Sequence, residues 1–263
     1  MILARLPIDL GPGIRAAFTT TTTGNLGLTL GDDPAAVVRR RRTLDEWLGA
    51  PATYVRQVHG ADVHVCAGEP RAAGAAPPDA ADALVPADAL VATDGTALAV
   101  LVADCVPVLL ADPVHRVIGA VHAGRRGVVA GVVRAAVTAM EEVGARRADL
   151  RAVVGPAICG ACYEVPAELR DEVEALVPGT AATTSWGTPS LDLPAGVLRQ
   201  LREAGVGAHV LEACTLTDPR WFSHRGSGRQ AGDGHPRPPG RFAAVVRLTP
   251  GVSRPPSRGP GLA

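Results

Sequence analysis

The strongest constraint on the fold lies between residues 93 and 127, where three short apolar runs follow one another. They are rich in Val, Leu and Ala and comprise Ala97–Ala103, Pro107–Ala111 and Val117–Val121. Short apolar runs bounded by Asp, Pro and Gly are typical of buried β-strands. Cys105 follows the first run and His122 follows the third. We therefore expect the sheet to bring a thiol and an imidazole to a common edge.

Other strand-like and helix-like segments are interleaved along the chain, without a compositional break. The expected strands are Ile14–Thr19, Tyr54–Val58, Val63–Val65, Ala83–Val85, Ala89–Ala92, Leu150–Val154, Ala208–Leu211 and Arg241–Leu248. The expected helices begin near Asp32, Val128, Pro166 and Leu193 and end near Leu48, Val143, Val177 and Ala204. This order predicts a single α/β (α+β) domain with mixed sheets over residues 1–249. Loops are expected at 67–81 and 225–240, and a disordered tail at 250–263.

Charge and cysteine usage exclude several classes of protein. The chain has 26 basic and 26 acidic residues, so no excess of positive charge favours binding to nucleic acid or to a membrane surface. No window approaches the ~18 uninterrupted apolar residues of a membrane span. Five cysteines without regular spacing do not indicate a disulfide framework. The N-terminus does not resemble a signal peptide, and we expect a cytoplasmic protein.

Three side chains next to expected strands form a candidate metal site. They are His59, Cys105 and His122. Two imidazoles and a thiolate suit Zn²⁺, with a fourth position left for water or substrate. Three alternatives remain open on spacing alone. Cys105 can be a small buried hydrophobe, His122 can be a core histidine, or the two can form a metal-free nucleophile pair.

Two further clusters have less specific interpretations. The run Arg39–Arg42 in the first expected helix can bind an anion or form a solvated helix face. Cys159 and Cys162 form a CxxC with no second pair to match it, so we assign them, with Cys66, as structural thiols. Seven scattered histidines are too few for several copper centres, which excludes a multicopper oxidase.

Five blocks in a fixed order resemble the YfiH family, which is also called laccase-domain, multicopper polyphenol oxidoreductase-like or peptidoglycan editing factor. The blocks are Gln57–Gly60, Ala103–Pro107, His122–Gly124 with Arg126-Gly127, Gly155–Ile158 with Tyr163–Val165, and Cys214-Thr215 with Trp221–Arg225. The resemblance covers about Phe18 to Val246. It implies mixed β-sheets packed together with helices outside. It also implies a metal, usually zinc and less often copper, on His59, Cys105 and His122.

The resemblance also implies an activity. Members are described as purine nucleoside phosphorylases that deaminate adenosine, so the expected partners are a nucleoside and phosphate, and the expected state is a monomer or homodimer. Arg126 and Arg225 are candidate phosphate ligands, because guanidinium groups hold oxyanions well. Structural ion pairing is the alternative role for both. Gln57 can orient a base or satisfy buried backbone, and Ser223 can contact substrate or cap a turn.

The chain departs from the family pattern near the expected site. Residues 19–27 lack the usual Arg and Gly-Gly-Val-Ser segment, and Arg125 replaces the Trp of the His-Ala-Gly-Trp-Arg-Gly block. Two other functions remain open, and the altered loop favours the second of them. One is a peptidoglycan editing amidase that removes Ser from a UDP-muramoyl precursor. The other is a non-catalytic paralogue that retains zinc for stability.

Overall fold

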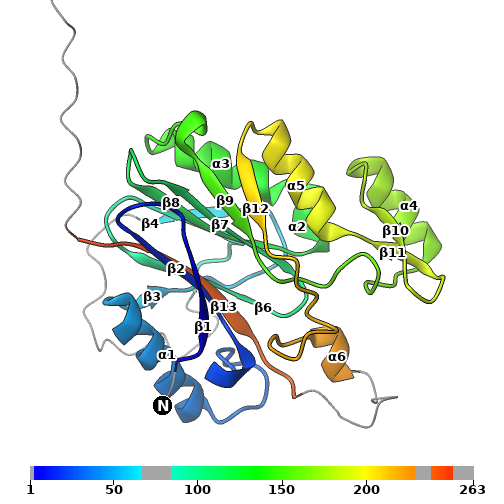
Figure 1. Cartoon of the computed structure of the whole chain (residues 1–263), viewed down its shortest axis with the longest axis horizontal. Coiled ribbons are helices and arrows are strands. Elements are labelled where there is room, and N and C mark those ends of the chain that lie inside the picture. Colours follow the sequence, from blue (N-terminus) through cyan, green and yellow to red (C-terminus); the bar gives the residue numbers. More distant parts are fainter. Residues whose placement is uncertain (1–2, 67–83, 229–237, 251–263) are drawn as a thin grey trace, which may run out of the picture.

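Two β-sheets form the centre of the molecule (Figure 1), in a computed structural model that describes residues 3–66, 84–228 and 238–250. The first sheet has five strands in the order β1-β2-β13-β6-β3. Their bounds are Arg5–Ile8, Ile14–Thr19, Phe242–Leu248, Ala97–Val102 and Ala52–Thr53. All pairs are antiparallel except β3–β6, so the sheet is mixed.

The second sheet has six strands in the order β12-β9-β7-β8-β5-β4. Their bounds are Gly207–Val210, Arg151–Val154, Val106–Asp112, Val117–Ala123, Ala89–Ala92 and Val63–Cys66. The outer pairs β12–β9 and β4–β5 are parallel, and the inner pairs are antiparallel. The central strands β7 and β8 are buried along their whole length.

The molecule has four layers: a helical layer, the first sheet, the second sheet and a second helical layer. Successive side chains along each strand point alternately to the core between the sheets and to the helices. Along β6, Leu98 and Val100 join the core between the sheets, whereas Ala97 and Ala99 face α1. Along β7, Leu109 faces the first sheet, and its neighbours on the strand face the helices that cover the second. The period of two follows from strand geometry. Because the aromatic content is only 3%, Ala, Val and Leu fill most of these layers.

Helices cover the two outer faces. On the first sheet lies α1 (Pro34–Leu48), capped by Asp33 and ended by Gly49 in the left-handed conformation. The second sheet is covered by α2 (Arg125–Ala130), α3 (Val132–Glu142) and α5 (Leu193–Glu203). The peripheral elements are η1 (Thr21–Thr23), η3 (Arg147–Asp149), α4 (Ala167–Leu176), the hairpin β10–β11 (Ala181–Thr183 and Pro189–Leu191) and α6 (His224–Gly228). Within the described ranges, no helix has the length and hydropathy needed to cross a bilayer.

Most expected elements are present, and the fold class is confirmed as a single domain with mixed sheets and flanking helices. Four expectations were wrong. No strand forms over Tyr54–Val58, because β3 ends before it at Thr53, and residues 84–85 are not in a strand either. The helix expected over Val128–Val143 is broken at Gly131, which has φ +82°. The loop expected at 225–240 begins as α6.

Three strands were not expected, namely β1, β10 and β11. Other expectations fall on residues outside the described ranges. They concern Ala83, the whole loop at 67–81, residues 229–237 and the tail beyond residue 250.

Candidate metal centre and pocket

Two connections cross from the first sheet to the second, and each carries one expected ligand. The connection from β3 to β4 contains His59, and the connection from β6 to β7 contains Cys105. His122 lies in β8 on the same face as Ile118 and Ala120, which belong to the core between the sheets. The three donors therefore meet where the chain passes between the sheets.

The three side chains fit a metal ion. Their donor atoms all lie within 4.8 Å of one another, and Cys105 Sγ is 3.8 Å from His59 Nε2. In a tetrahedral zinc site with ordinary Zn–S and Zn–N bonds, sulfur and nitrogen are about 3.5 Å apart. The imidazole rings of His59 and His122 meet edge to face, with centroids 4.8 Å apart. A small closing movement would therefore bring the three donors around one ion.

A buried carboxylate, Asp88, orients both histidines. It accepts a hydrogen bond of 2.7 Å from Nδ1 of His122, which leaves Nε2 for a ligand. It also accepts the backbone N–H groups of Val58, His59 and Gly60 at 3.2, 3.0 and 2.6 Å. Carboxylate partners of this kind fix the tautomer and direction of a metal-binding imidazole. Asp88 therefore holds both the His122 ring and the turn that carries His59.

The centre favours an ionised thiol. Burial opposes the charge on Cys105, but His122 and then His59 outweigh it and lower the pKa of the thiol to about 6. Burial lowers the pKa of His122, whereas the Cys105 thiolate and Asp88 raise it to about 9. The thiolate is the form that binds a metal.

The backbone around the centre is closely fitted. A Cβ at Gly124 would lie 2.5 Å from His59 Cδ2 and 3.2 Å from Cys105 Sγ, so only glycine leaves room for the His59 ring. In the described part of the chain, three non-glycine residues have positive φ, and two of them, His59 and Asp104, lie at this centre. Such strained conformations persist where surrounding contacts over-determine them.

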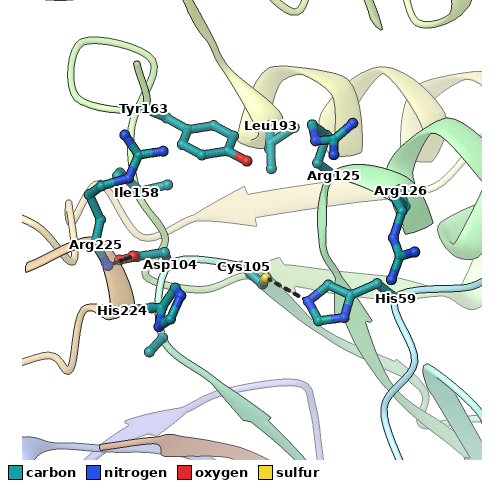
Figure 2. A pocket seen from close by; sticks show the side chains of 11 residues that line it. His59, Asp104, Cys105, Arg125, Arg126, Ile158, Tyr163, Leu193, His224 and Arg225 are labelled. Atoms are coloured by element: carbon teal, nitrogen blue, oxygen red, sulfur yellow. Dashed lines mark hydrogen bonds between the residues drawn. The ribbon is translucent and has the colours of Figure 1, made fainter. Parts of the chain in front are cut away.

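A pocket of about 320 Å³ opens on His59 and Cys105 (Figure 2). Ile158, Tyr163 and Leu193 give it an apolar wall, and His224 lies close to Asp104. Arg125 and Arg126 extend from the start of α2 on one side, and Arg225 lies on the other side beside the Tyr163 ring. The pocket thus combines two donors of the His59, Cys105 and His122 group, an apolar wall and three guanidinium groups.

Internal contacts anchor several of these polar groups. Arg126 donates to the carbonyl of Val58 at 3.2 Å, and Arg225 donates to the carbonyl of Glu164 at 3.1 Å. Asp104 accepts the hydroxyl of Thr215 and the backbone N–H of Arg225, both at 2.6 Å. Both oxygens of Asp104 are therefore engaged, and the carboxylate serves to tie the pocket walls together.

Two residues expected to contact substrate have other partners. The Gln57 amide donates to the carbonyl of Leu101 and accepts its N–H, both at 2.8 Å, and so continues the β3–β6 pairing with a side chain. Ser223 is buried, and its hydroxyl accepts the N–H of Gly226 at the start of α6. Backbone satisfaction and capping were the alternative roles for these residues, and their contacts favour those roles.

Sequence reasoning did not assign Asp88 to the centre and treated Arg125 only as a departure from a family pattern. Nothing local marks Asp88, which is 34 residues from His122 in the chain and follows an apparently featureless Pro-Ala pair. Arg125 directly precedes Arg126 at the start of a helix, and this adjacency was the available signal.

Comparisons with known proteins give a consistent relationship. A family model described as multi-copper polyphenol oxidoreductase laccase matches residues 15–249. A Streptomyces griseus protein named purine nucleoside phosphorylase ORF3 is 52% identical over 217 residues, which cover 79% of this chain and 85% of that protein. The Mycobacterium tuberculosis protein named purine nucleoside phosphorylase Rv2149c is 46% identical over 228 residues, covering 85% and 84% of the two chains.

Solved structures agree with this relationship. The structure titled Bacillus licheniformis hypothetical protein YfiH superposes with a TM-score of 0.79 at 27% identity, covering 94% of this chain and 97% of that one. YlmD from Geobacillus stearothermophilus gives a TM-score of 0.77 at 31% identity, covering 90% and 93%.

Proposed function

The chain belongs to the multi-copper polyphenol oxidoreductase laccase family, which includes the YfiH and YlmD proteins, and on this basis we propose that it is a metal-dependent purine nucleoside phosphorylase. The observation that carries the proposal is the pocket, where a His/Cys/His donor set adjoins three arginines and an apolar wall. The names of the relatives from Streptomyces griseus and Mycobacterium tuberculosis support the same reaction.

Zn²⁺ is the proposed ion, held by His59, Cys105 and His122. The mixed thiolate and imidazole set is one that zinc prefers, and Asp88 supplies the expected outer partner. When bound, the ion supplies Lewis-acid activation of a water or a substrate oxygen. Among the described residues, only this group of potential ligands contains more than one histidine. That composition does not suit the several copper centres of a laccase.

In phosphorolysis, a phosphate oxygen attacks the anomeric carbon while the bond to the purine nitrogen breaks, and the base leaves with the electron pair. Arg126 and Arg225 are the proposed phosphate ligands, with Arg125 as a third. Ile158, Leu193 and the Tyr163 ring offer apolar surface for the purine. Burial raises the pKa of the Tyr163 hydroxyl, so it remains protonated and able to donate a hydrogen bond.

Adenosine deamination is proposed as a second reaction of the same pocket. It requires attack of water at purine C6 and release of ammonia, and needs no phosphate. The two reactions use the same base site and differ in the nucleophile. They can therefore be separated by omitting phosphate from the assay.

The test is incubation of metal-analysed protein with inosine and with adenosine, each with and without phosphate. We expect release of hypoxanthine only with phosphate, and conversion of adenosine to inosine without it. Cys105→Ala and His122→Ala should abolish both reactions, whereas the matched control Cys66→Ala should retain them. Nucleosides left unchanged by the wild-type protein, or full activity in both site variants, would overturn the proposal.

A change in phosphate affinity tests the arginines. Arg126→Gln should raise the KM for phosphate about tenfold, because losing a charge-assisted hydrogen bond costs roughly 1.5 kcal/mol or more. The matched control is Arg42→Gln, an exposed arginine on α1 that lies outside the pocket. An unchanged KM in Arg126→Gln would assign that side chain to its contact with Val58 alone. Release of Ser from a muramoyl-Ser precursor, with no action on nucleosides, would indicate the editing amidase instead.

A further inference from the structure

Three thiols meet at a second place in the fold. Cys159 and Cys162 lie on one turn after β9, and Cys214 lies after β12. Their sulfur atoms are all within 4.8 Å of one another, although Cys214 is far from the other two in the sequence. Cys162 is buried, and Cys159 and Cys214 are half-buried, so solvent reaches the group. Cys214 supplies the third donor that the CxxC lacked in the sequence.

Backbone contacts hold these two segments together without help from the thiols. The N–H of Ala157 donates to the carbonyl of Ala213 at 3.3 Å, and the N–H of Thr215 donates to the carbonyl of Ala157 at 3.0 Å. The N–H of Cys162 donates to the carbonyl of Cys159 at 2.9 Å, which closes the turn. The three side chains are therefore presented by paired backbone, and their approach is built into the fold.

The spacing suits a shared ion. With Zn–S bonds of about 2.3 Å, tetrahedral thiolates place their sulfur atoms about 3.8 Å apart. A disulfide requires about 2.05 Å between two sulfur atoms and leaves the third thiol unused. A separation of up to 4.8 Å among three donors is thus close to the ion-binding arrangement.

We propose that Cys159, Cys162 and Cys214 form a second metal site, which binds a thiophilic d¹⁰ cation, Zn²⁺ or Cu⁺, through three sulfur atoms. The fourth position of a zinc ion would face the half-exposed side and take water. Thiolates select these two ions over Mg²⁺ or Ca²⁺. The site uses none of the ligands of the first centre and does not depend on the reaction proposed for that centre.

The second ion would brace the pocket wall. Ile158 and Tyr163, which line the pocket, flank the two cysteines of the turn. Thr215, which donates to Asp104 at 2.6 Å, is adjacent to Cys214. An ion on the three sulfurs would join the segment that carries Ile158 and Tyr163 to the segment that anchors Asp104.

Metal content tests the site. Protein purified from medium supplemented with zinc and copper is analysed for both elements, which also identifies the ion. We expect two ions per wild-type chain, one at His59, Cys105 and His122 and one at the three cysteines. His122→Ala and Cys214→Ser should each retain one ion. The matched control Cys66→Ser, at a thiol outside both groups, should retain two. An unchanged metal content in Cys214→Ser, or no ion in a folded His122→Ala, overturns the proposal.

Cobalt substitution provides a measurement that does not require removal of a cysteine from the second group. Metal-free protein is titrated with Co²⁺, and the thiolate-to-cobalt charge-transfer absorbance is recorded. Three of the four expected Co–S bonds belong to the second site, so Cys105→Ala should keep about three-quarters of the absorbance. Loss of the whole band in folded Cys105→Ala would refute the site.

Discussion

Asp88 shows how much one buried side chain can determine at the residue scale. Its two oxygens accept hydrogen bonds from Nδ1 of the His122 ring and from three consecutive backbone N–H groups around His59. Burial would raise its pKa, but these hydrogen bonds outweigh burial and hold the pKa below its usual range. Asp88 therefore remains ionised and sets the direction of two proposed ligands.

Replacement of Asp88 by Asn tests this role. An amide keeps the size of the side chain but loses the charge, and one of its two acceptor positions becomes a donor facing N–H groups. We expect metal affinity to fall about 10- to 100-fold, the usual cost of losing an outer carboxylate partner. Competition against a chromophoric chelator measures the change. Asp62→Asn, at a nearby exposed carboxylate, is the control and should leave the affinity unaltered.

Gly124 makes a steric prediction. In Gly124→Ala, the added methyl would overlap His59 Cδ2, which lies 2.5 Å from the ideal Cβ position. The His59 ring must turn away, so the variant should lose both metal and nucleoside phosphorylase activity while its circular dichroism stays native. Gly207→Ala is the control, because a Cβ there has no neighbour within 4 Å. Normal metal binding by Gly124→Ala would remove His59 from the proposed ligand set.

At the scale of elements, one carboxylate fastens the β7–β8 turn to the loop after α3. Asp112, at the end of β7, is fully buried and accepts the N–H groups of Val114 and His115 at 2.9 and 2.8 Å. It also contacts the His115 ring and accepts the N–H of Arg146, both at 2.8 Å. Burial would raise its pKa, but these bonds outweigh burial and lower it.

This arrangement gives a pH-dependent stability. Because the folded pKa of Asp112 is below its ordinary value of 3.8, its contribution is present above that value and is lost as pH falls through the folded pKa. Asp112→Asn should lower the free energy of unfolding by about 2 kcal/mol near neutral pH. Urea midpoints should show the difference from wild type shrinking in acid. Asp171→Asn, at an exposed carboxylate of α4, should match wild type throughout.

Local sequence patterns identified the elements in which the spacing of apolar residues and the residues that start and end an element indicate the same bounds. The strand at Ile14–Thr19 and the helix ending at Leu48 before Gly49 match the expected bounds closely. The strand at Tyr54–Val58 was predicted wrongly. Its apolar residues pack against the core without forming a strand, and the Gln57 side chain, in place of the backbone, makes the hydrogen bonds with Leu101 of β6. The break at Gly131 was missed because Val128–Val143 stays apolar on one face across it. Both errors arise from tertiary contacts, which a local window does not contain.

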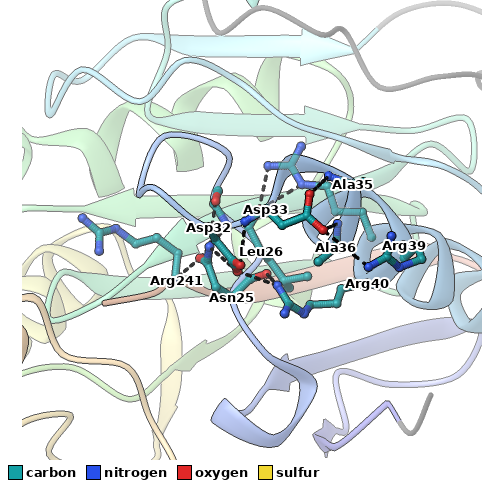
Figure 3. A network of polar contacts seen from close by, with 11 residues as sticks. Asn25, Leu26, Asp32, Asp33, Ala35, Ala36, Arg39, Arg40 and Arg241 are labelled. Atoms are coloured by element: carbon teal, nitrogen blue, oxygen red, sulfur yellow. Dashed lines mark hydrogen bonds and ion pairs between the residues drawn. The ribbon is translucent and has the colours of Figure 1, made fainter. Parts of the chain in front are cut away.

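The arginines of α1 show the same limit. Figure 3 places Arg40 against Asp32 and Asn25, and the ion pair with Asp32 measures 2.6 Å. Arg41 is buried over the Tyr54 ring and donates to the carbonyl of Leu26. Both residues thus bind the loop that departs from the family pattern, in place of an external anion. The sequence contained the charges but not the carbonyl groups and carboxylates that meet them.

At the scale of the whole molecule, the proposed ion would join the two sheets. His59 and Cys105 lie on separate crossings between the sheets, and His122 belongs to a central strand of the second. An ion present at a thousandfold its dissociation constant adds about 4 kcal/mol to stability. Chelation should therefore lower the melting temperature of the wild-type protein by about 10 °C. Scanning calorimetry measures the shift.

The variant His122→Ala controls for the effect of removing metal from any site other than the first centre. It should already melt at a lower temperature and should lose less on chelation than the wild type. If both proteins lose the same number of degrees, the first centre contributes nothing to cohesion between the sheets.

The sequence predicted the overall class. It offered the three proposed ligands as candidates next to apolar runs, and the family resemblance implied that they share a metal. It did not predict which of the remaining thiols and carboxylates meet in space. Cys214 joins Cys159 and Cys162 through pairing between segments about fifty residues apart, and Asp88 reaches His122 across neighbouring strands. Long-range pairing of this kind has no local signature.

The connections between the two sheets limit which insertions such a chain can tolerate during evolution. A ligand on a connection is positioned by the number of residues on either side of it. Only residues 103–105 separate β6 from β7, so one additional codon there would shift Cys105 relative to both histidines. A codon added within 144–146, in the loop that meets the opposite end of β7 from Cys105, would leave the three donors in register. In a library of single-codon insertions, the positions that tolerate no insertion should therefore include the two crossings that carry His59 and Cys105.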